Sequence, residues 1–274
     1  SANICLGDVA QFKNTSTIGG ADYIVTKWEF DDPDSTITDD NSDIKDGFWE
    51  YSTYGSGVVV EMTVANGLYP KFEYSTTNTI TVTPKPEIDF KVLNACEGSP
   101  ITVINSTSIS GGSPITYSWD FGGVGTSTLE NPSYTFATPG IREVTVVALS
   151  NGCESTLTKN AYQFEKPVAD FTSMGECNFV DVEFMSTSTI ANGANMGYSW
   201  DFAGSGISRE EGPAFAFATP GNKSVTLTAT SEFGCVDVIT QNISLNESPV
   251  ADFDWIEACN LTPIAFNFTG SVPA

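Results

Sequence analysis

One pentapeptide returns almost unchanged along this chain and sets the period of its architecture. Tyr-Ser-Trp-Asp-Phe occupies residues 117–121 and returns at residues 198–202, which is 81 residues later. A looser copy, Lys-Trp-Glu-Phe, stands at residues 27–30. Residues two apart in a strand point to the same face, so the Trp and Phe of each copy can enter one core. A fixed period of this length indicates an array of similar folding units.

Short stretches of alternating apolar residues fill each period. In the second unit they include residues 101–108, 115–121 and 142–150, and the Asn-Gly pair at residues 151–152 is a strong hairpin signal. About seven short strands per unit predict an all-β fold made of two-sheet sandwiches. The side chains expected to lie between the sheets are Trp28, Trp119 and Trp200.

The period divides the 274 residues into three units and a remnant. We expect sandwiches at residues 1–86, 87–166 and 167–249, named here the first, second and third repeats, and the first two strands of a fourth at residues 250–274. The first repeat carries an acidic insertion and lacks the opening strand of the others, because its first residues already lie past the position equivalent to Ile88-Asp89-Phe90. The last residues stop partway into a fourth copy, so we interpret the chain as part of a longer protein. The links between units are very short and contain proline, which predicts a semi-rigid, head-to-tail rod.

The charge balance disfavours several classes of partner. The chain has 11 Lys and Arg residues, 34 Asp and Glu residues and a net charge of -23. Nucleic acid and anionic membranes attract clustered basic side chains, so neither is an expected partner. No apolar run is long enough to span a bilayer, so we expect no direct membrane insertion.

Catalytic chemistry has few residues to carry it. The chain has no histidine, so neither a Ser-His-Asp nor a Cys-His arrangement can form. No glycine-rich phosphate loop of the P-loop type occurs. We therefore expect no enzyme activity, no catalytic or cofactor-binding residues and no organic cofactor.

The repeated motifs resemble the PKD domain, the immunoglobulin-like module named after polycystic kidney disease. Its signature combines Trp-Asp-Phe-Gly, an Asn-Pro pair followed by an aromatic residue, and a Pro-Gly turn before an alternating strand. The matching stretches of this chain are residues 119–122, 131–134, 138–140, 200–202 and 219–221. The family's second acidic residue is missing, because Gly123-Val124 and Gly204-Ser205 stand in its place. The resemblance covers residues 86–248 well, residues 4–83 loosely and the tail by its first two strands. It implies tandem immunoglobulin-like sandwiches.

The cysteine-bearing form of the repeat resembles those strung together in very large surface adhesins of gliding and other Bacteroidetes. That resemblance implies an exported protein that is displayed on the cell surface. It also implies a non-catalytic spacer that projects a distant binding tip. The implied partners are neighbouring repeats of the same chain, together with surface polysaccharide or other cell-surface proteins.

The cysteines occupy regular positions. Cys5, Cys96 and Cys177 each lie 23 residues before the Trp of their repeat, and Cys153 and Cys235 lie beyond the sixth strand of theirs. A zinc site would need CxxC pairs or histidines, and the chain has neither. Disulfides formed in an oxidising compartment are the better interpretation.

Two pairing schemes are open for these cysteines. One closes each repeat on itself, as Cys96–Cys153 and Cys177–Cys235, and the other joins successive repeats, as Cys5–Cys153 and Cys96–Cys235. In a sandwich the two cysteine-bearing loops lie at opposite poles, about 26 Å apart for eight strand residues. Bridged Cα atoms lie within ~7 Å of each other, so this separation favours the pairs between repeats. That scheme leaves Cys177 and Cys259 for partners beyond residue 274.

The acidic insertion of the first repeat lies between Phe30 and Gly55. Carboxylate oxygens are the ligands that Ca²⁺ prefers in proteins. The candidate calcium ligands are Asp31, Asp32, Asp34, Asp39 and Asp43. Ile44 stands where an EF-hand loop has glycine, which disfavours an EF-hand, and the alternative is a solvated acidic loop.

A glycan-binding accessory module of a secreted hydrolase is the alternative function. Trp28, Trp49, Tyr51 and Trp255 would support it if they formed an exposed row of rings. The distances of Trp49 and Tyr51 from the turn glycine instead match core aromatic residues of the second repeat. The repetition of similar units joined by short links favours the spacer function over the glycan-binding module.

Overall fold

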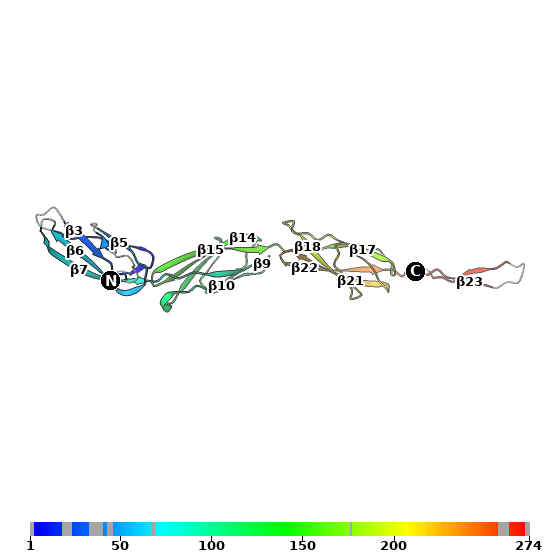
Figure 1. Ribbon diagram of the computed structural model, residues 1–274. Helices are drawn as coiled ribbons and strands as arrows, with labels where there is room; N and C mark the ends of the chain where they lie inside the picture. Colours follow the sequence, from blue (N-terminus) through cyan, green and yellow to red (C-terminus); the bar gives the residue numbers. More distant parts are fainter. Residues whose placement is uncertain are drawn as a thin grey trace. The chain divides into compact units, whose positions relative to one another are not determined.

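The computed structural model describes seven stretches of the chain, and their regular secondary structure is almost entirely β-strand (Figure 1). The described residues are 3–17, 24–32, 41–42, 46–66, 69–175, 177–256 and 263–271. The helical structure within these stretches is a single 3-10 turn at Ser110–Gly112. The predicted all-β fold is confirmed. No helix in this part of the chain is long and apolar enough to cross a membrane.

The chain separates into two compact units. One comprises residues 1–93, 101–134 and 141–161, and the other comprises residues 94–100, 135–140 and 162–274. The first unit holds the whole first repeat and most of the second. The other unit holds the end of the second repeat and everything that follows it. The division therefore runs through the second repeat and leaves each neighbouring repeat in one piece.

The first repeat is a two-sheet sandwich. Its larger sheet has the order β1-β7-β6-β3-β4, and its smaller sheet pairs β2 with β5. The strands are β1 Asn3–Cys5, β2 Val9–Phe12, β3 Ile24–Glu29, β4 Asn41–Ser42, β5 Gly47–Glu50, β6 Gly55–Asn66 and β7 Tyr69–Thr83. Ala10 of β2 and Trp28 of β3 pack in one cluster with Val60 of β6 and Ile80 of β7, so the core lies between the sheets.

The second repeat pairs a three-stranded sheet of order β13-β10-β8 with a five-stranded sheet of order β12-β11-β14-β15-β9. The strands are β8 Phe90–Leu93, β9 Ala95–Cys96, β10 Ile101–Asn105, β11 Thr116–Phe121, β12 Thr126–Ser127, β13 Ser133–Tyr134, β14 Gly140–Ser150 and β15 Cys153–Phe164. Strand β11 carries the repeated pentapeptide and pairs with β14, which places Trp119 opposite Val146. Trp119 and Phe121 are buried and Asp120 between them is not, as the strand period predicts.

The third repeat follows the same plan, with sheets of order β16-β17-β20 and β19-β18-β21-β22. The strands are β16 Phe171–Met174, β17 Asp181–Ser186, β18 Met196–Phe202, β19 Ile207–Ser208, β20 Ala214–Ala216, β21 Gly221–Ser231 and β22 Val236–Leu245. Trp200 of β18 lies opposite Leu227 of β21. A separate hairpin, β23 Phe253–Trp255 with β24 Phe266–Phe268, follows this repeat.

The three tryptophans of the motif are buried. Trp119 and Trp200 have no exposed surface, and Trp28 is 5% exposed. A buried indole N–H needs an acceptor, and the carbonyl ten residues further on supplies it in two repeats. Trp119 donates to Leu129 O at 2.9 Å and Trp200 donates to Glu210 O at 2.8 Å. The motif therefore fixes both a core ring and the loop that follows its strand.

Candidate functional site at the junctions between repeats

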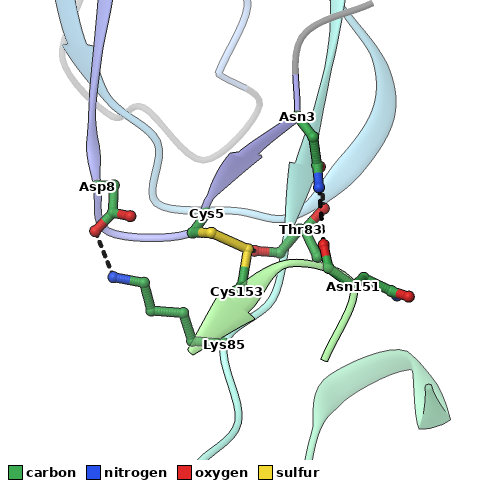
Figure 2. Close-up of a disulfide and its surroundings, with 7 residues drawn as sticks. All are labelled: Asn3, Cys5, Asp8, Thr83, Lys85, Asn151 and Cys153. Carbon is green, nitrogen blue, oxygen red and sulfur yellow. Dashed lines mark hydrogen bonds and ion pairs between the residues drawn. A yellow bond between two sulfur atoms is a disulfide. The ribbon is translucent and has the colours of Figure 1, made fainter. Parts of the chain in front are cut away.

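The first junction, meaning the contacts between the first and second repeats, is closed by a disulfide from Cys5 to Cys153 (Figure 2). Cys5 ends β1 and Cys153 begins β15, and their Cα atoms are 5.6 Å apart. Strand β1 pairs in parallel with the end of β7, where Cys5 lies opposite Thr83. The bond therefore lies where the chain leaves the first repeat.

An Asn-Gly turn presents Cys153 at this junction. Asn151 and Gly152 have φ values of 49° and 83°. Positive φ at both central residues is the geometry of a type I′ hairpin turn, which Asn-Gly favours. The Asn151 carbonyl also accepts a hydrogen bond from Asn3 Nδ2 at 3.0 Å. One local turn signal thus provides the cysteine and a second tie between the repeats.

Polar contacts surround this disulfide in Figure 2. The Thr83 hydroxyl donates to the side-chain carbonyl of Asn3, and the Lys85 ammonium pairs with the Asp8 carboxylate. Lys85 belongs to the proline-containing link, so the ion pair fastens that link to the first repeat. An exposed ion pair contributes on the order of 0–1 kcal/mol, whereas a disulfide typically contributes about 2–4 kcal/mol. The covalent bond is therefore the main constraint at the first junction.

The second junction, between the second and third repeats, uses the same elements one period later. Cys96 and Cys235 form a disulfide with Cα atoms 5.6 Å apart. Cys96 ends β9, which pairs in parallel with the end of β15. Phe164, the last residue of β15, stacks on Phe233 with ring centroids 4.4 Å apart and planes 3° apart. Such a pair contributes about 0.5–1.5 kcal/mol beyond the area it buries, so this junction is also closed by an apolar contact.

A buried glutamine joins the strands that end at the second junction. The Gln163 side chain accepts a hydrogen bond from Phe136 N at 3.1 Å. It donates to Ser99 O at 3.2 Å and to Cys96 O at 3.4 Å. A buried amide is costly unless its hydrogen bonds are made, so these three bonds hold the loop of Cys96 against β15.

The link after the second repeat is fastened to the third repeat. Lys166 Nζ lies 2.7 Å from Asp237 Oδ1, and Ala169 N donates to Asp237 Oδ2 at 2.9 Å. The hydrogen bond from Lys166, together with the one from Ala169, holds the pKa of Asp237 below its ordinary value. Lys85 is paired instead with the repeat that precedes it, so the two links are fastened in opposite directions.

The disulfides are the pairs that join successive repeats. Cys96 and Cys153 are each bonded to another repeat, so the pairing inside a repeat does not form. Cys177 occupies the equivalent position of the third repeat, opposite Asn246 just beyond β22. It has no disulfide partner among the residues that the structure describes. Cys259 lies outside those residues.

The calcium candidates are only partly described. Asp34, Asp39 and Asp43 lie outside the described residues. Asp31 is exposed and has a φ of 43°, and Asp32 is buried. No group of three or more metal-binding side chains occurs within the described stretches. Calcium binding by the acidic insertion therefore stays a prediction.

The Asp32 carboxylate is bound by the chain itself. Ser52 N donates to it at 3.0 Å, and the hydroxyls of Ser52 and Thr53 donate at 3.1 and 3.0 Å. Trp49 Nε1 adds a longer contact at 3.4 Å. Burial alone would raise the pKa of Asp32, but these hydrogen bonds outweigh it and hold the pKa below its ordinary value. Asp32 therefore acts as the anchor of the turn that follows β5.

Replacing Asp32 with asparagine should loosen this turn. Hydrogen bonds to a charged group contribute about 1.5–3 kcal/mol, so we expect a loss of that order in the first repeat. Folding lowers the pKa of Asp32, so the stabilisation by its charged carboxylate depends on pH. This stabilisation is complete above the pKa of about 3.9 in the unfolded chain, and it is lost as the pH falls through the lower pKa of the folded chain. Hydrogen exchange of the amides at residues 46–53 in the full chain measures both effects. The exposed Asp31→Asn is the matched control, and an equal loss in both variants would contradict the anchoring role.

The aromatic residues considered for glycan binding do not form one exposed row. Trp28 and Tyr51 are buried, and Trp49 stacks on Phe30 with ring centroids 5.2 Å apart. These three rings belong to the core of the first repeat, where the spacing of Trp49 and Tyr51 places them. Trp255, in contrast, is 59% exposed on β23.

Several junction contacts have no counterpart among the sequence predictions. They are the Phe164–Phe233 stack, the Gln163 network and the Lys166–Asp237 ion pair. Phe233 precedes Cys235 by two residues and Phe164 ends a long strand, but no periodic pattern pairs one with the other. The local sequence signal that does indicate a junction contact is the Asn-Gly turn directly before Cys153.

A family model described as the PKD domain matches residues 81–163 and 165–245. The pre-pro-metalloprotease PrtV of Vibrio cholerae serotype O1 is 25% identical over 181 residues, which cover 65% of this chain and 19% of that protein. The chain therefore spans about a fifth of the length of this curated relative.

Similar solved structures include single PKD domains and a titin fragment. The PKD1 domain of Vibrio anguillarum Epp is 24% identical and covers 30% of this chain and 96% of that chain, with a TM-score of 0.28. The PKD1 domain from the Vibrio cholerae metalloprotease PrtV is 33% identical and covers 30% of this chain and 98% of that chain, with a TM-score of 0.27. The I-band fragment from titin is 13% identical and covers 90% of this chain and 95% of that chain, with a TM-score of 0.42. Because the family model matches more than half of the residues, including both copies of the pentapeptide, this chain belongs to the PKD domain family.

Proposed function

We propose that this chain is a non-catalytic spacer segment of a large, repetitive cell-surface adhesin of the type found in gliding Bacteroidetes. The observation that carries the proposal is that each disulfide joins two successive repeats. A bond that served only the stability of a single sandwich would close within that sandwich. Bonds between sandwiches instead tie neighbouring repeats into one covalently linked array.

The two disulfide loops overlap. Cys96 lies within the span of 148 residues from Cys5 to Cys153, and Cys153 lies within the span of 139 residues from Cys96 to Cys235. The second repeat therefore takes part in both bonds. A pull along the chain passes through the sulfur atoms before it can separate the strands of the second repeat. This arrangement suits a segment that transmits tension.

The cysteine chemistry supports export to the cell surface. Structural disulfides form and persist in oxidising compartments, and two of them hold this array together. The net charge of -23 keeps neighbouring molecules apart and soluble outside the cell. Neighbouring repeats are the direct partners of each repeat, and surface polysaccharide or other cell-surface proteins are the proposed ligands of the parent adhesin.

Force measurements test the tension-bearing role. In the variant Cys96→Ser with Cys235→Ser, the remaining disulfide should shield 148 residues from a pull applied at the chain ends. Adding a reductant should then lengthen the fully unfolded chain by about 50 nm, at ~3.4 Å per residue. Single-molecule force spectroscopy measures this length. An unfolded length that does not change with reductant would show that the disulfide does not bear the load.

A cell assay tests the adhesin itself. Cells that carry both substitutions in the parent protein should export it normally but detach at a lower shear stress, because the second junction then has only non-covalent contacts. The matched control is Cys177→Ser, which removes a cysteine that has no disulfide partner in the described part of the chain. Equal detachment of all three strains would count against a spacer under tension.

A glycan-binding accessory module of a secreted hydrolase is the second candidate. It is favoured by the relative PrtV, which is a metalloprotease by name, and by the exposed rings of the β23–β24 hairpin. These rings are Phe253, Trp255, Phe266 and Phe268. A glycan array probed with the 274-residue chain separates the candidates. Binding that Trp255→Ala abolishes would favour the module over the spacer.

We also propose that residues 250–274 open a fourth repeat. An isolated bridge joins Val250 to Ser271, and the third repeat has the same bridge 82 residues earlier, between Val168 and Thr189. The β23–β24 hairpin likewise repeats the antiparallel pairing of β16 with β17. An array that continues past the third repeat is what a long spacer requires.

A further inference from the structure

The second junction has non-covalent contacts that would hold it if its disulfide were reduced. Three consecutive residues at the end of the second repeat and in the link each contact the third repeat. These contacts are Phe164 with Phe233, Glu165 with the backbone N–H of Asn192, and Lys166 with Asp237. None of them involves a sulfur atom, so all of them remain when the disulfide of this junction is opened.

The equivalent residues at the first junction contact their own repeat instead (Figure 2). Thr83 and Phe164 are equivalent, because each lies opposite the first cysteine of its repeat. The Thr83 hydroxyl donates to the side chain of Asn3, and Lys85 pairs with Asp8. Both partners belong to the first repeat. These contacts therefore do not hold the second repeat in place.

Within the described stretches, the other contacts that cross the first junction are weak. Asn3 Nδ2 donates to Asn151 O at 3.0 Å, but this hydrogen bond is exposed to water. The ring of Tyr54 lies near Gly111, and Tyr54 stays 50% exposed. A freed Cys153 thiol has a backbone carbonyl of the first repeat 3.9 Å away and is only a weak donor. Opening this disulfide therefore leaves the first junction without a strong tie.

The difference arises in the hairpin that presents the second cysteine of each junction. Two residues separate Ser150 from Cys153 in the second repeat, whereas three separate Ser231 from Cys235 in the third. The longer turn carries Phe233 at its centre, and this ring is 49% exposed even while it is stacked. The longer turn therefore supplies a ring contact that the Asn-Gly turn lacks.

We propose that the first junction is a hinge operated by small thiols, in which opening of the Cys5–Cys153 bond frees residues 84–86 to bend while the second junction stays closed. One thiolate attacks the partly exposed sulfur of Cys5 and releases Cys153, and a second thiolate then displaces Cys5. Each cysteine takes up the proton that an attacking thiol gave up. The products are two cysteine thiols and one small disulfide. The proposal goes beyond the spacer role and does not depend on it.

The contacts at the second junction should also make its disulfide harder to open. Two thiols re-form a disulfide more readily when other contacts keep them together, because their effective concentration is then higher. Those contacts keep Cys96 beside Cys235 after reduction, whereas Cys5 and Cys153 separate. We therefore expect reduction of the second pair to need a ratio of squared thiol to disulfide concentration about ten- to hundredfold higher.

Glutathione buffers test this difference. The intact 274-residue chain is equilibrated in mixtures of reduced and oxidised glutathione, its free thiols are alkylated, and mass spectrometry reports the reduced fraction of each pair. Phe233→Ala should lower the ratio that the second pair needs by about two- to tenfold, because it removes the stack. The matched control is Phe179→Ala, which removes a ring that is 71% exposed in the same repeat and should leave both pairs unchanged.

Nuclear magnetic relaxation of the backbone amides tests the hinge itself. In Cys5→Ser with Cys153→Ser, the first repeat should show a shorter rotational correlation time than the second repeat, without any reductant. In Cys96→Ser with Cys235→Ser, the second and third repeats should keep a common value. The indole signals of the three core tryptophans verify that every repeat stays folded in both variants.

Two results would overturn the proposal. One is half-reduction of both cysteine pairs at the same glutathione ratio. The other is equal loosening of the two junctions in the two serine variants, because the contacts of Phe233 and the link would then not hold the second junction closed.

Discussion

Replacing Trp119 with alanine is expected to lower the stability of the second repeat by about 3–5 kcal/mol, the range for large aromatic residues in cores. The ring is fully buried and makes an edge contact with Phe90. The substitution also removes the ring N–H that donates to Leu129 O. A small domain has only about 5–15 kcal/mol of stability, so a large part of it would be lost. Urea unfolding combined with hydrogen exchange of the β11 and β14 amides measures the loss.

The matched control for this prediction is Trp255→Ala. Trp255 is 59% exposed on the β23–β24 hairpin, so its removal should change stability by about 0.5 kcal/mol or less. Because both variants remove the same side chain, any difference reports burial and not composition. A similar loss in the two variants would contradict the assignment of Trp119 to the core.

Removing the second disulfide by Cys96→Ser with Cys235→Ser should lower stability by about 4–5 kcal/mol in the absence of reductant. The bond spans 139 residues and so strongly restricts the unfolded chain. The Phe164–Phe233 stack and the Gln163 network do not depend on the sulfur atoms. The circular dichroism spectrum of the folded chain should therefore stay unchanged while the urea midpoint falls.

Two controls separate this effect from the loss of a thiol side chain. Cys177→Ser should leave the midpoint unchanged, since Cys177 forms no disulfide with any described residue. A reductant also opens the Cys5–Cys153 bond in both chains, so under the same reducing conditions the parent chain should unfold at the midpoint of the double variant. A difference between the two chains that persists under reducing conditions would mean that packing around the cysteines, and not the covalent bond, supplies the stability.

The periodic features of this protein could be predicted from the sequence because they are local. Alternation with a period of two sends Trp119 and Phe121 inward whichever strand lies beside them. The Asn-Gly turn likewise requires only two residues with positive φ, which Asn151 and Gly152 supply. The fold class and the core tryptophans follow from such short-range rules.

The cysteine pairs could be reasoned out because strand length is proportional to residue number. Eight extended residues separate the poles of a sandwich by far more than a disulfide can span, so the distance in sequence becomes a distance in space. Cys96 and Cys235 are 139 residues apart, and no local pattern joins them. The order of the strands and the direction of each one are enough to place the two cysteines of a repeat at opposite poles.

The contacts that finish the junctions and the first repeat were decided by the tertiary structure alone. Gln163 finds its partners 27 to 67 residues away, at Phe136, Ser99 and Cys96, and Asp32 is bound by a turn about 20 residues further on. Such contacts depend on how loops from different strands meet in space. The amino-acid sequence sets the period of the strands, and the packing of the sheets decides which polar groups the loops bring within hydrogen-bonding distance.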